Sequence, residues 1–461
     1  MNGPFQLSQL AQELSAQLVG DDVSISRVST DTRSVESGDL FIALRGDNFD
    51  AHHFIQQAAD SGAVAVVVEH QVDSDLPQLI VSNTRQALGQ IAQYNRQYFN
   101  GSLFAITGSS GKTTVKEMLA AINKQRGQTL ATIGNLNNDI GVPLTLLRLS
   151  EGDQYAVIEM GASGPHEIAY STDLARPDVA ILNNAMGAHL EGFGSLQGVV
   201  QAKAEIFSGL SENGVAIVNL DDPHSSYWLG MLMQQPVLTF SILDSAADVY
   251  ASDIQLQNNG CYQFKLNYGQ ESQLVELGVL GRHNVANAVA AAAAVIADGC
   301  DLGTLATGLA QCVAVKGRMR PAQLNQQTLL IDDSYNANPG AVKIAINSLI
   351  ELNGDSVLVL GDMAELGSDE LEQHRDVGRY AAQKGVNKLY TCGRLSAETV
   401  EAYLQAGGKE AMNLGSREAL VELLSQLPAP SQGLQRNILV KGSRSAAMDQ
   451  VVDGLTDGGI C

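Results

Sequence analysis

Short apolar runs, separated by segments with helical spacing, recur along the whole chain. In the first part, runs at 39–44 and 64–68 flank a stretch at 54–61 whose apolar residues have the spacing of a helix. Runs of this length that are rich in Val and Ile are typical of strands. We therefore predict a small α/β domain that ends at a polar break near Asn83.

Four further apolar runs follow, at 103–106, 155–158, 178–182 and 214–218. They are apolar at successive positions, which is the pattern of parallel strands that helices cover on both faces. The segments between the runs are long enough to hold helices. This part of the chain predicts a doubly wound parallel sheet.

The alternation of strand and helix starts again after Val313. Apolar runs at 328–331, 357–360, 388–391 and 437–440 alternate with helical stretches, which is a Rossmann-like order. At 461 residues the chain has the length of about three domains. We predict an α/β fold with domains at 1–83, 84–313 and 314–461.

Composition and charge exclude several classes of protein. Apolar residues make up 45% of the chain and charged residues 17%, which is typical of a folded enzyme and not of a disordered chain. The formal net charge of -22 disfavours nucleic acid and anionic membranes as partners. The first residues lack the pattern of a secretory signal, no apolar run is long enough for a membrane span, and the five cysteines show no metal-binding spacing. We expect a cytoplasmic protein with free thiols and without membrane insertion.

A glycine-rich loop lies between the run at 103–106 and a helix with one apolar face. Glycines allow successive backbone N–H groups to point at one anion, and the N-terminus of the helix adds positive potential. Lys112 is placed to reach the β and γ oxygens of a nucleotide, and Thr113 to offer its hydroxyl to Mg²⁺. The predicted nucleotide-binding residues of this loop are Gly108, Ser109, Ser110, Gly111, Lys112, Thr113 and Thr114.

The loop departs from the full GxxxxGK[ST] pattern, because Ile106 stands where the first glycine is expected. The alternative is a glycine-rich turn that only caps a helix, but the position between strand and helix favours nucleotide binding. The chain has no NKxD sequence of the kind that reads guanine. ATP is therefore the expected nucleotide.

Seven longer motifs resemble those of the Mur ligases, in the same order. They are STDTRSVESGDLFIALRGDNFDAHHF from Ser29, GNLNNDIGVPLTLL from Gly134, AHLEGFGS from Ala188, GRHNVANA from Gly281, DDSYNANP from Asp332, GDMAELG from Gly361 and KGSRSAAM from Lys441. The resemblance covers the chain from end to end and is strongest to the branch that adds D-alanyl-D-alanine. It implies an N-terminal domain for a UDP-sugar, a central ATPase domain and a C-terminal domain that closes over ATP and holds the dipeptide.

The family reaction activates a peptide carboxylate as an acyl phosphate, which an amine then attacks to form the amide. The implied substrates are UDP-N-acetylmuramoyl-tripeptide and D-alanyl-D-alanine, and the implied role is peptidoglycan precursor synthesis, on which cell shape and division depend. We expect a monomer.

Three residues near the phosphate loop resemble the metal side of the family's site. Glu159 ends an apolar run, where ligands of doubly wound sheets gather, and is expected to bind Mg²⁺. His189 matches the family's contact to a second metal, although a lone histidine is more often structural. Lys203 would be repelled by metal cations as an ammonium; by resemblance it is expected to react with CO₂ and become an anionic carbamate. An ordinary solvated lysine is the alternative.

Further residues resemble the family's nucleotide contacts. Asn284 and Asn287 lie one turn apart and are expected to face adenine, with helix capping as the alternative. Arg318 is expected to reach the γ-phosphate when the domains close. The resemblance sets Asp333, Tyr335 and Asn336 around the ribose and adenine, unless the aspartates of this motif only cap the next helix.

The remaining expected contacts are to the UDP-sugar peptide. By resemblance, one loop meets the muramoyl-peptide and one N-terminal segment surrounds UDP. The residues are Asn135, Asn137 and Asn138 in the loop, and Thr30, Asp31, Arg33 and Arg45 in the segment.

Two other functions compete with this interpretation. The first is a sister Mur-type ligase that adds a different amino acid, but the DNPR motif of the enzyme that adds the third peptide residue is absent, with ANPG at 337–340 in its place. The second is a nucleotide-gated binding module without chemistry. Glu159, His189 and Lys203 together argue against it, because a switch does not need three additional groups beside a metal.

Overall fold

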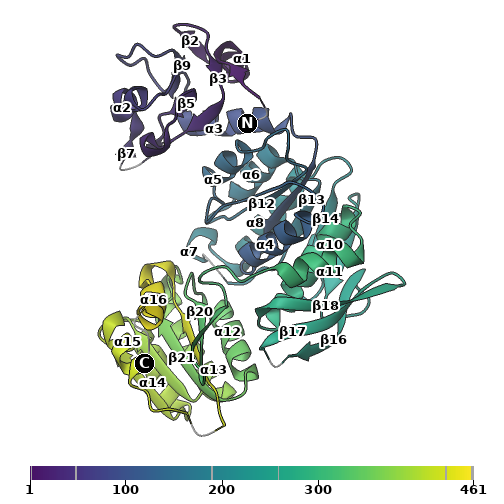
Figure 1. Ribbon diagram of the computed structural model, residues 1–461, viewed down its shortest axis with the longest axis vertical. Helices are drawn as coiled ribbons and strands as arrows, with labels where there is room; N and C mark the ends of the chain where they lie inside the picture. The colour runs from purple at the N-terminus through teal and green to yellow at the C-terminus, as the bar shows by residue number, and fades with distance from the viewer. Residues whose placement is uncertain (2, 47–48, 188–189, 258, 431–432, 458–461) are drawn as a thin grey trace.

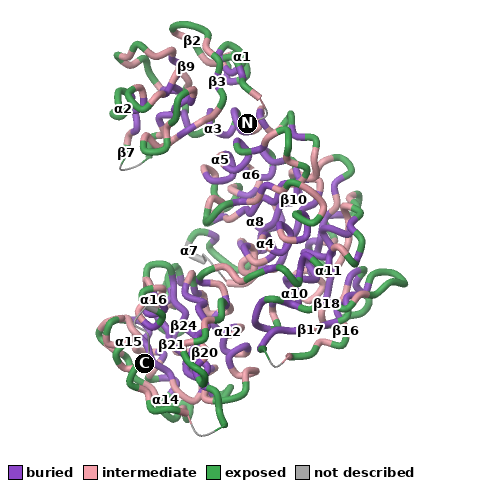
Figure 2. Tube along the Cα trace, in the orientation of Figure 1, coloured by how far each residue is buried: buried purple, intermediate pink, exposed green. Residues whose placement is uncertain are grey.

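The computed structural model describes residues 1, 3–46, 49–187, 190–257, 259–430 and 433–457. Three main sheets follow one another along the chain, with the N-terminal sheet at one end of the molecule and the C-terminal sheet at the other (Figure 1). Helices cover the sheets, and buried residues concentrate in the strands and on the inner faces of the helices (Figure 2). The predicted α/β class is confirmed.

The N-terminal sheet has five strands in the order β2-β9-β8-β5-β4, and two short ribbons, β1-β3 and β6-β7, accompany it. Strands β5 and β8 are buried throughout, as their continuous apolar runs predict. The elements are β1 (Phe5–Gln6), α1 (Leu7–Glu13), β2 (Gln17–Val19), β3 (Ser24–Ile25), β4 (Arg27–Ser29), η1 (Thr32–Ser34), β5 (Asp39–Ile42), β6 (Arg45–Gly46), β7 (Phe49–Asp50), η2 (Ala51–Phe54), α2 (Ile55–Asp60), β8 (Ala65–Val68) and β9 (Gln78–Ile80).

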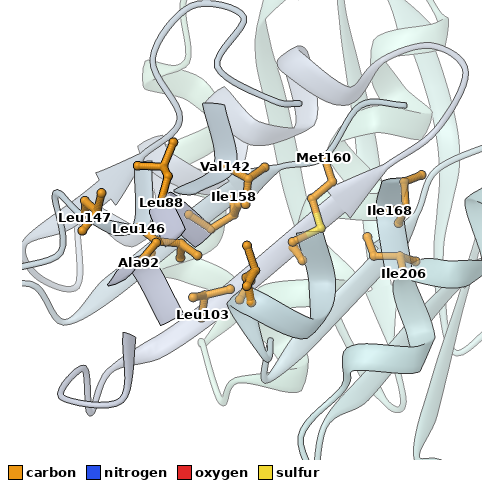
Figure 3. Close-up of a cluster of buried hydrophobic side chains, with 14 of the residues drawn as sticks. Leu88, Ala92, Leu103, Val142, Leu146, Leu147, Ile158, Met160, Ile168 and Ile206 are labelled. Carbon is orange, nitrogen blue, oxygen red and sulfur yellow. The ribbon is translucent and has the colours of Figure 1, made fainter. Parts of the chain in front are cut away.

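Helix α3 (Thr84–Arg96) connects this sheet to the central part of the molecule. Asn83 caps it by accepting a hydrogen bond from the Gln86 backbone N–H. Its buried side chains, such as Leu88 and Ala92, point into a cluster that also contains Leu103, Leu146 and Ile158 (Figure 3). The same cluster includes residues of α1, so α3 packs against both parts.

The central sheet has nine strands in the order β11-β12-β10-β13-β14-β15-β16-β17-β18. Neighbours from β11 to β16 are parallel. Strands β10, β12, β13 and β14 correspond to the four predicted runs, whereas β11, β15 and β16 were not predicted. The strands are β10 (Ser102–Thr107), β11 (Thr129–Ala131), β12 (Tyr155–Glu159), β13 (Val179–Leu182), β14 (Val215–Asn219), β15 (Val237–Ser241), β16 (Val249–Leu256), β17 (Cys261–Tyr268) and β18 (Glu271–Leu280). The helices are α4 (Lys112–Asn123), α5 (Gly141–Leu146), α6 (Glu167–Ala175), α7 (Leu190–Phe193), α8 (Leu196–Ala204), η3 (Glu205–Gly209), α9 (Ser225–Met231), α10 (His283–Ala297) and α11 (Leu302–Gln311).

The antiparallel strands β17 and β18 extend this sheet beyond the doubly wound part and were not predicted. Their burial alternates, because one face packs on α10 and α11 and the other meets solvent. Helix α10 is buried along almost its whole length. Within the described residues, no helix is long and apolar enough to cross a membrane.

The C-terminal sheet has the order β19-β20-β24-β21-β22-β23, parallel except for the pair β19 and β20. The carboxyl ends of β20, β21 and β24 carry the motifs at 332–339, 361–367 and 441–448. The elements are β19 (Arg320–Asn325), β20 (Thr328–Asp333), α12 (Pro339–Glu351), β21 (Asp355–Gly361), η4 (Gly367–Asp369), α13 (Glu370–Lys384), β22 (Lys388–Cys392), α14 (Ser396–Gln405), β23 (Glu410–Leu414), α15 (Arg417–Ser425), β24 (Arg436–Lys441), η5 (Arg444–Ala446) and α16 (Asp449–Asp457).

Candidate active site

The glycine-rich loop joins β10 to α4, so the predicted order of strand, loop and helix is confirmed. Gly111 has a φ of 78°, and a Cβ there would collide with the amides of Asn183 and Asn287. Only glycine fits both the left-handed backbone and the close approach. Helix α4 begins directly after Gly111, so its first N–H groups, which have no acceptor within the helix, lie at the loop, where an anion is favoured.

Two asparagines after β13 hold the loop in place. Asn184 accepts a hydrogen bond from the Ser110 N–H at 2.9 Å and returns one to the Ser110 carbonyl at 3.1 Å. Asn183 donates to the same carbonyl at 3.1 Å and to Asn287 Oδ1 at 3.0 Å. The sequence analysis missed both residues. Their only signal was an Asn-Asn pair directly after an apolar run, at the edge where ligands of such sheets gather.

Lys112 lies over the loop, with Nζ donating to the Gly108 carbonyl at 2.7 Å. Burial lowers the pKa of its ammonium; the carboxylate of Glu159 opposes this shift and the charge of Arg318 adds to it. A cation that protein atoms desolvate interacts more strongly with a phosphate than a solvated one does.

Glu159 ends β12, next to β10, and only 2% of the residue is exposed. Asn137 donates to its Oε1 at 2.8 Å, while Oε2 is buried and has no hydrogen-bond partner among the described residues. A buried carboxylate oxygen left without a donor is costly unless a cation meets it. Glu159 and the Thr113 hydroxyl are oxygen ligands of the kind Mg²⁺ takes, so the residues fit this ion.

Within the described ranges, no group of three His, Cys, Asp or Glu side chains could enclose a metal by itself. Mg²⁺ commonly takes one or two protein oxygens and completes its shell with water and substrate phosphates. His189 lies outside the described residues.

Lys203 lies near the end of α8, is 2% exposed, and holds Nζ 5.4 Å from the centre of the Phe193 ring. Burial, and then the charge of Lys112, lower the pKa of Lys203 to about 7, against the opposing carboxylates of Glu167 and Glu205. The ordinary solvated lysine is therefore excluded. A substantial part of this amine is neutral near pH 7.

The opposite wall of the site comes from the C-terminal domain. Arg318 Nη2 donates to the Thr113 hydroxyl at 3.4 Å, and the guanidinium lies 4.3 Å from the centre of the Tyr335 ring. The structure thus brings the predicted arginine to the phosphate loop. Asp333 accepts from the Met319 N–H and from Lys441. It does not cap α12, because Asn338 does.

Asn284 and Asn287 are buried in the first turns of α10, where Arg282 takes the N-cap position. The capping alternative for the two asparagines is therefore wrong. Asn284 donates to the Leu280 carbonyl at 2.7 Å, and Asn287 donates to Asn284 Oδ1 at 2.7 Å.

A cavity of about 380 Å³ lies between the central and C-terminal domains. Its walls are the phosphate loop, the start of α10 and the segments around Arg318 and Asp333. His283 faces it, and burial lowers the pKa of this histidine to about 4, so it is neutral at pH 7. The sequence analysis missed several lining residues: Asn183, Asn184, Asn219, Asp221, Asp222, His283, Met319 and Lys441.

The other predicted residues lie elsewhere. Asn336 lines a second cavity in the C-terminal domain. Asn135 is exposed, and Asn138 Oδ1 accepts from the Gly141 N–H at 2.8 Å at the start of α5. Asn137 is the member of this loop that meets the site, through Glu159.

The predicted UDP residues belong to the N-terminal domain, at the far end of the molecule from the C-terminal domain (Figure 1). Asp31 and Arg33 form an ion pair at 2.6 Å, and hydrogen bonds from Arg33 lower the pKa of Asp31 to about 2. Thr30 is half-buried beside them, while Arg45 is largely exposed, 3.9 Å from the nearest carboxylate oxygens.

Comparisons with known proteins match this chain along its length. Residues 24–96 match the "Mur ligase family, catalytic domain", residues 106–295 the "Mur ligase middle domain", and residues 317–444 the "Mur ligase, glutamate ligase domain". The UDP-N-acetylmuramoyl-tripeptide--D-alanyl-D-alanine ligase of Escherichia coli K12 is 47% identical over 99% of both chains. The enzyme of the same name from Haemophilus influenzae is 43% identical over 97% of this chain and 98% of its own.

Solved structures of proteins named MurF have the same fold as this chain. A crystal structure of MurF from Acinetobacter baumannii has a TM-score of 0.92 at 36% identity, covering 99% of each chain. MurF ligase from Thermotoga maritima in complex with ADP has a TM-score of 0.83 at 28% identity, covering 94% of this chain and 97% of its own. With the loop and the arginine around one cavity, and a buried carboxylate at the end of the strand beside β10, these matches show that the chain belongs to the Mur ligase family.

Proposed function

We propose that this protein is the ATP-dependent ligase that joins D-alanyl-D-alanine to UDP-N-acetylmuramoyl-tripeptide in peptidoglycan precursor synthesis. The observation that carries the proposal is one cavity whose walls are the phosphate loop, α10 and the segment of Arg318. The choice of acceptor rests on the relatives of this name that match over the full length.

The residues divide the chemistry between two domains. Lys112 and Arg318 both offer positive charge at the phosphate loop, where a phosphoryl group would leave ADP for the carboxylate of the tripeptide. Mg²⁺, when bound through Thr113 and Glu159, supplies further positive charge at the phosphates. Asn284 and Asn287 form the wall for the base. We assign the muramoyl-peptide to the loop of Asn137, whose amide donates to Glu159.

We also propose that Lys203 is carbamoylated. A buried ammonium so close to Lys112 that its charge lowers the Lys203 pKa opposes the binding of a cation. The neutral amine can add CO₂ and lose a proton, which gives an anion of similar length that is able to meet a metal.

We assign the dipeptide to the second cavity, of about 420 Å³, at the carboxyl ends of β20, β21 and β24. Arg444 lines it together with Ser443, Ser445, Asn336 and Glu365. A guanidinium beside hydroxyl groups suits the carboxylate end of a dipeptide. Arg444 pairs with Asp449 at 3.1 Å. Its side chain is 69% exposed, so a ligand can reach it from solvent.

Replacing Arg444 by alanine should raise the KM for D-alanyl-D-alanine by about tenfold, because one charge-assisted hydrogen bond is lost at an exposed position. The KM for ATP should not change. Steady-state kinetics with each substrate varied in turn measures both. Arg394→Ala, at an exposed arginine paired with Glu370, is the matched control. An unchanged KM for the dipeptide would contradict the assignment.

Phosphate release from ATP tests the overall function. With UDP-N-acetylmuramoyl-tripeptide present, D-alanyl-D-alanine should stimulate release far more than glutamate or a diamino acid does. Preference for one of those acceptors would point to a sister ligase. ATP binding without release in the presence of any acceptor would point to a binding module without chemistry.

A further inference from the structure

The segment that connects the central and C-terminal domains, residues 317–319, lies directly on the loop that follows β20. The Gly317 N–H donates to Asp332 Oδ2 at 2.7 Å, and the Gly317 carbonyl accepts from the Tyr335 N–H at 3.2 Å. Gly317 has a φ of 79°, and a Cβ there would come within 2.9 Å of the Tyr335 Cβ. The Gly317 backbone is therefore held by the Asp332 carboxylate and by the Tyr335 backbone, and there is no room for a side chain at this position.

Met319 continues this segment in a strained conformation. Its φ is 51°, a value that a residue with an unbranched side chain rarely adopts unless its surroundings hold it. Its N–H donates to Asp333 Oδ1 at 3.2 Å, and its side chain is buried. The Met319 N–H belongs to the peptide unit that joins Arg318 to Met319. Holding this N–H therefore restricts the Arg318 backbone and, with it, the direction of the Arg318 side chain.

Lys441 holds the other oxygen of the same carboxylate. It ends β24 opposite Asp333 in the parallel register, and only 4% of the residue is exposed. Its Nζ donates to Asp333 Oδ2 at 2.6 Å and to the Asn336 carbonyl at 2.9 Å. One buried carboxylate thus bridges the Lys441 ammonium and the Met319 backbone.

We propose that Lys441 is a positioning residue for phosphoryl transfer: it fixes Asp333, which fixes Met319, and so holds the Arg318 guanidinium over the phosphate loop. This inference rests on the proposed ligase function. We call this set of contacts, from Lys441 through Asp333 to Met319, the clasp. Tyr335 adds to it, because the Tyr335 N–H donates to the Gly317 carbonyl and the Tyr335 ring lies 4.3 Å from the Arg318 guanidinium. Lys441 also lines the cavity between the domains, so direct contact with the nucleotide is the competing role.

The two roles differ in kinetics. If Lys441 acts through Arg318, Lys441→Met should lower kcat by about 100-fold, the effect of a misplacement of about 1 Å, while the KM for ATP changes little. Lys441→Arg, which keeps the charge, should recover part of kcat. In an Arg318→Ala background, Lys441→Met should cause no further loss, because two residues that act as a unit are not additive.

The control lies on the same strand. Arg436 begins β24, is also buried, and pairs with Asp355 at 2.9 Å. Arg436→Met should lower the melting temperature as Lys441→Met does but leave kcat close to wild type. If Lys441→Met does not fold, Lys441→Gln, which keeps a donor for the Asn336 carbonyl, takes its place in the same comparisons.

The results that would overturn the role of Lys441 differ from the result that would overturn the proposed ligase function. A raised KM for ATP with an unchanged kcat would make Lys441 a nucleotide contact and overturn the clasp. Losses that multiply in the double variant, or an equal kcat loss in Arg436→Met, would do the same. If the wild-type protein formed no ADP in response to D-alanyl-D-alanine, the proposed function itself would fail.

Discussion

Replacing Lys112 by alanine should lower turnover by about 100-fold or more while leaving the fold intact. The ammonium lies over the phosphate loop, and among the residues that the structure describes only a backbone carbonyl of the loop itself is hydrogen-bonded to it. Removing one preorganised charge of this kind commonly lowers kcat by about 10²- to 10³-fold, which corresponds to several kcal/mol of transition-state stabilisation. The rate of dipeptide-dependent ADP formation, with a thermal melt of each variant, measures the effect.

Lys124 provides the matched control for Lys112. It follows the same helix at its other end and is exposed. Lys124→Ala should retain the wild-type rate and melting temperature. A Lys112→Ala protein that keeps more than about a tenth of the wild-type rate would exclude a role in stabilising the transferring phosphoryl group.

Replacing Lys203 by alanine should also leave a nearly inactive enzyme, which small carboxylic acids restore in part. The alanine variant loses the carbamate, and an acid at high concentration can occupy the same anion position beside the metal. Activity of the wild-type protein should fall as the pH drops through about 7, because the pKa of Lys203 lies near this value and only the neutral amine adds CO₂. Bicarbonate should offset part of this fall.

Lys203→Arg distinguishes the carbamate from a simple positive charge. The guanidinium keeps the charge but cannot form a carbamate, so this variant should be as inactive as Lys203→Ala. Full activity in Lys203→Arg would end the carbamate proposal. An alanine variant that no carboxylic acid rescues, together with a wild-type rate independent of bicarbonate, would also count against it.

The features that the sequence predicts well are those that depend on neighbouring residues. Helix α4 shows Val115, Met118, Leu119 and Ile122 on its buried face because these positions repeat with the period of a helix. The parallel strands of the central sheet are continuous apolar runs, since helices cover both faces. Strands β17 and β18 escaped prediction because exposed residues interrupt their apolar positions, so neither strand shows the continuous apolar run of the parallel strands.

In the site, too, the residues that local sequence patterns mark were predicted, and those that depend on distant contacts were not. The loop and Glu159 follow strand ends, which local pattern reveals. Asn184 and Lys441 form hydrogen bonds to residues that lie 74 and 108 positions away in the sequence. The pattern of neighbouring residues does not show which distant segments will meet, so these contacts could not be predicted. The domain limits at residues 83 and 313 stay predictions. The roles of Lys112, Lys203, Arg444 and Lys441 also stay predictions, and the experiments above test them.

The origin of the phosphate oxygen tests the central claim most directly. The tripeptide substrate can be prepared with a heavy oxygen isotope in the carboxylate that is to be joined, and the released phosphate analysed by mass spectrometry. If this protein activates that carboxylate as an acyl phosphate, each amide bond formed with D-alanyl-D-alanine should transfer one labelled oxygen to phosphate. Unlabelled phosphate from a reaction that forms the amide would contradict this account.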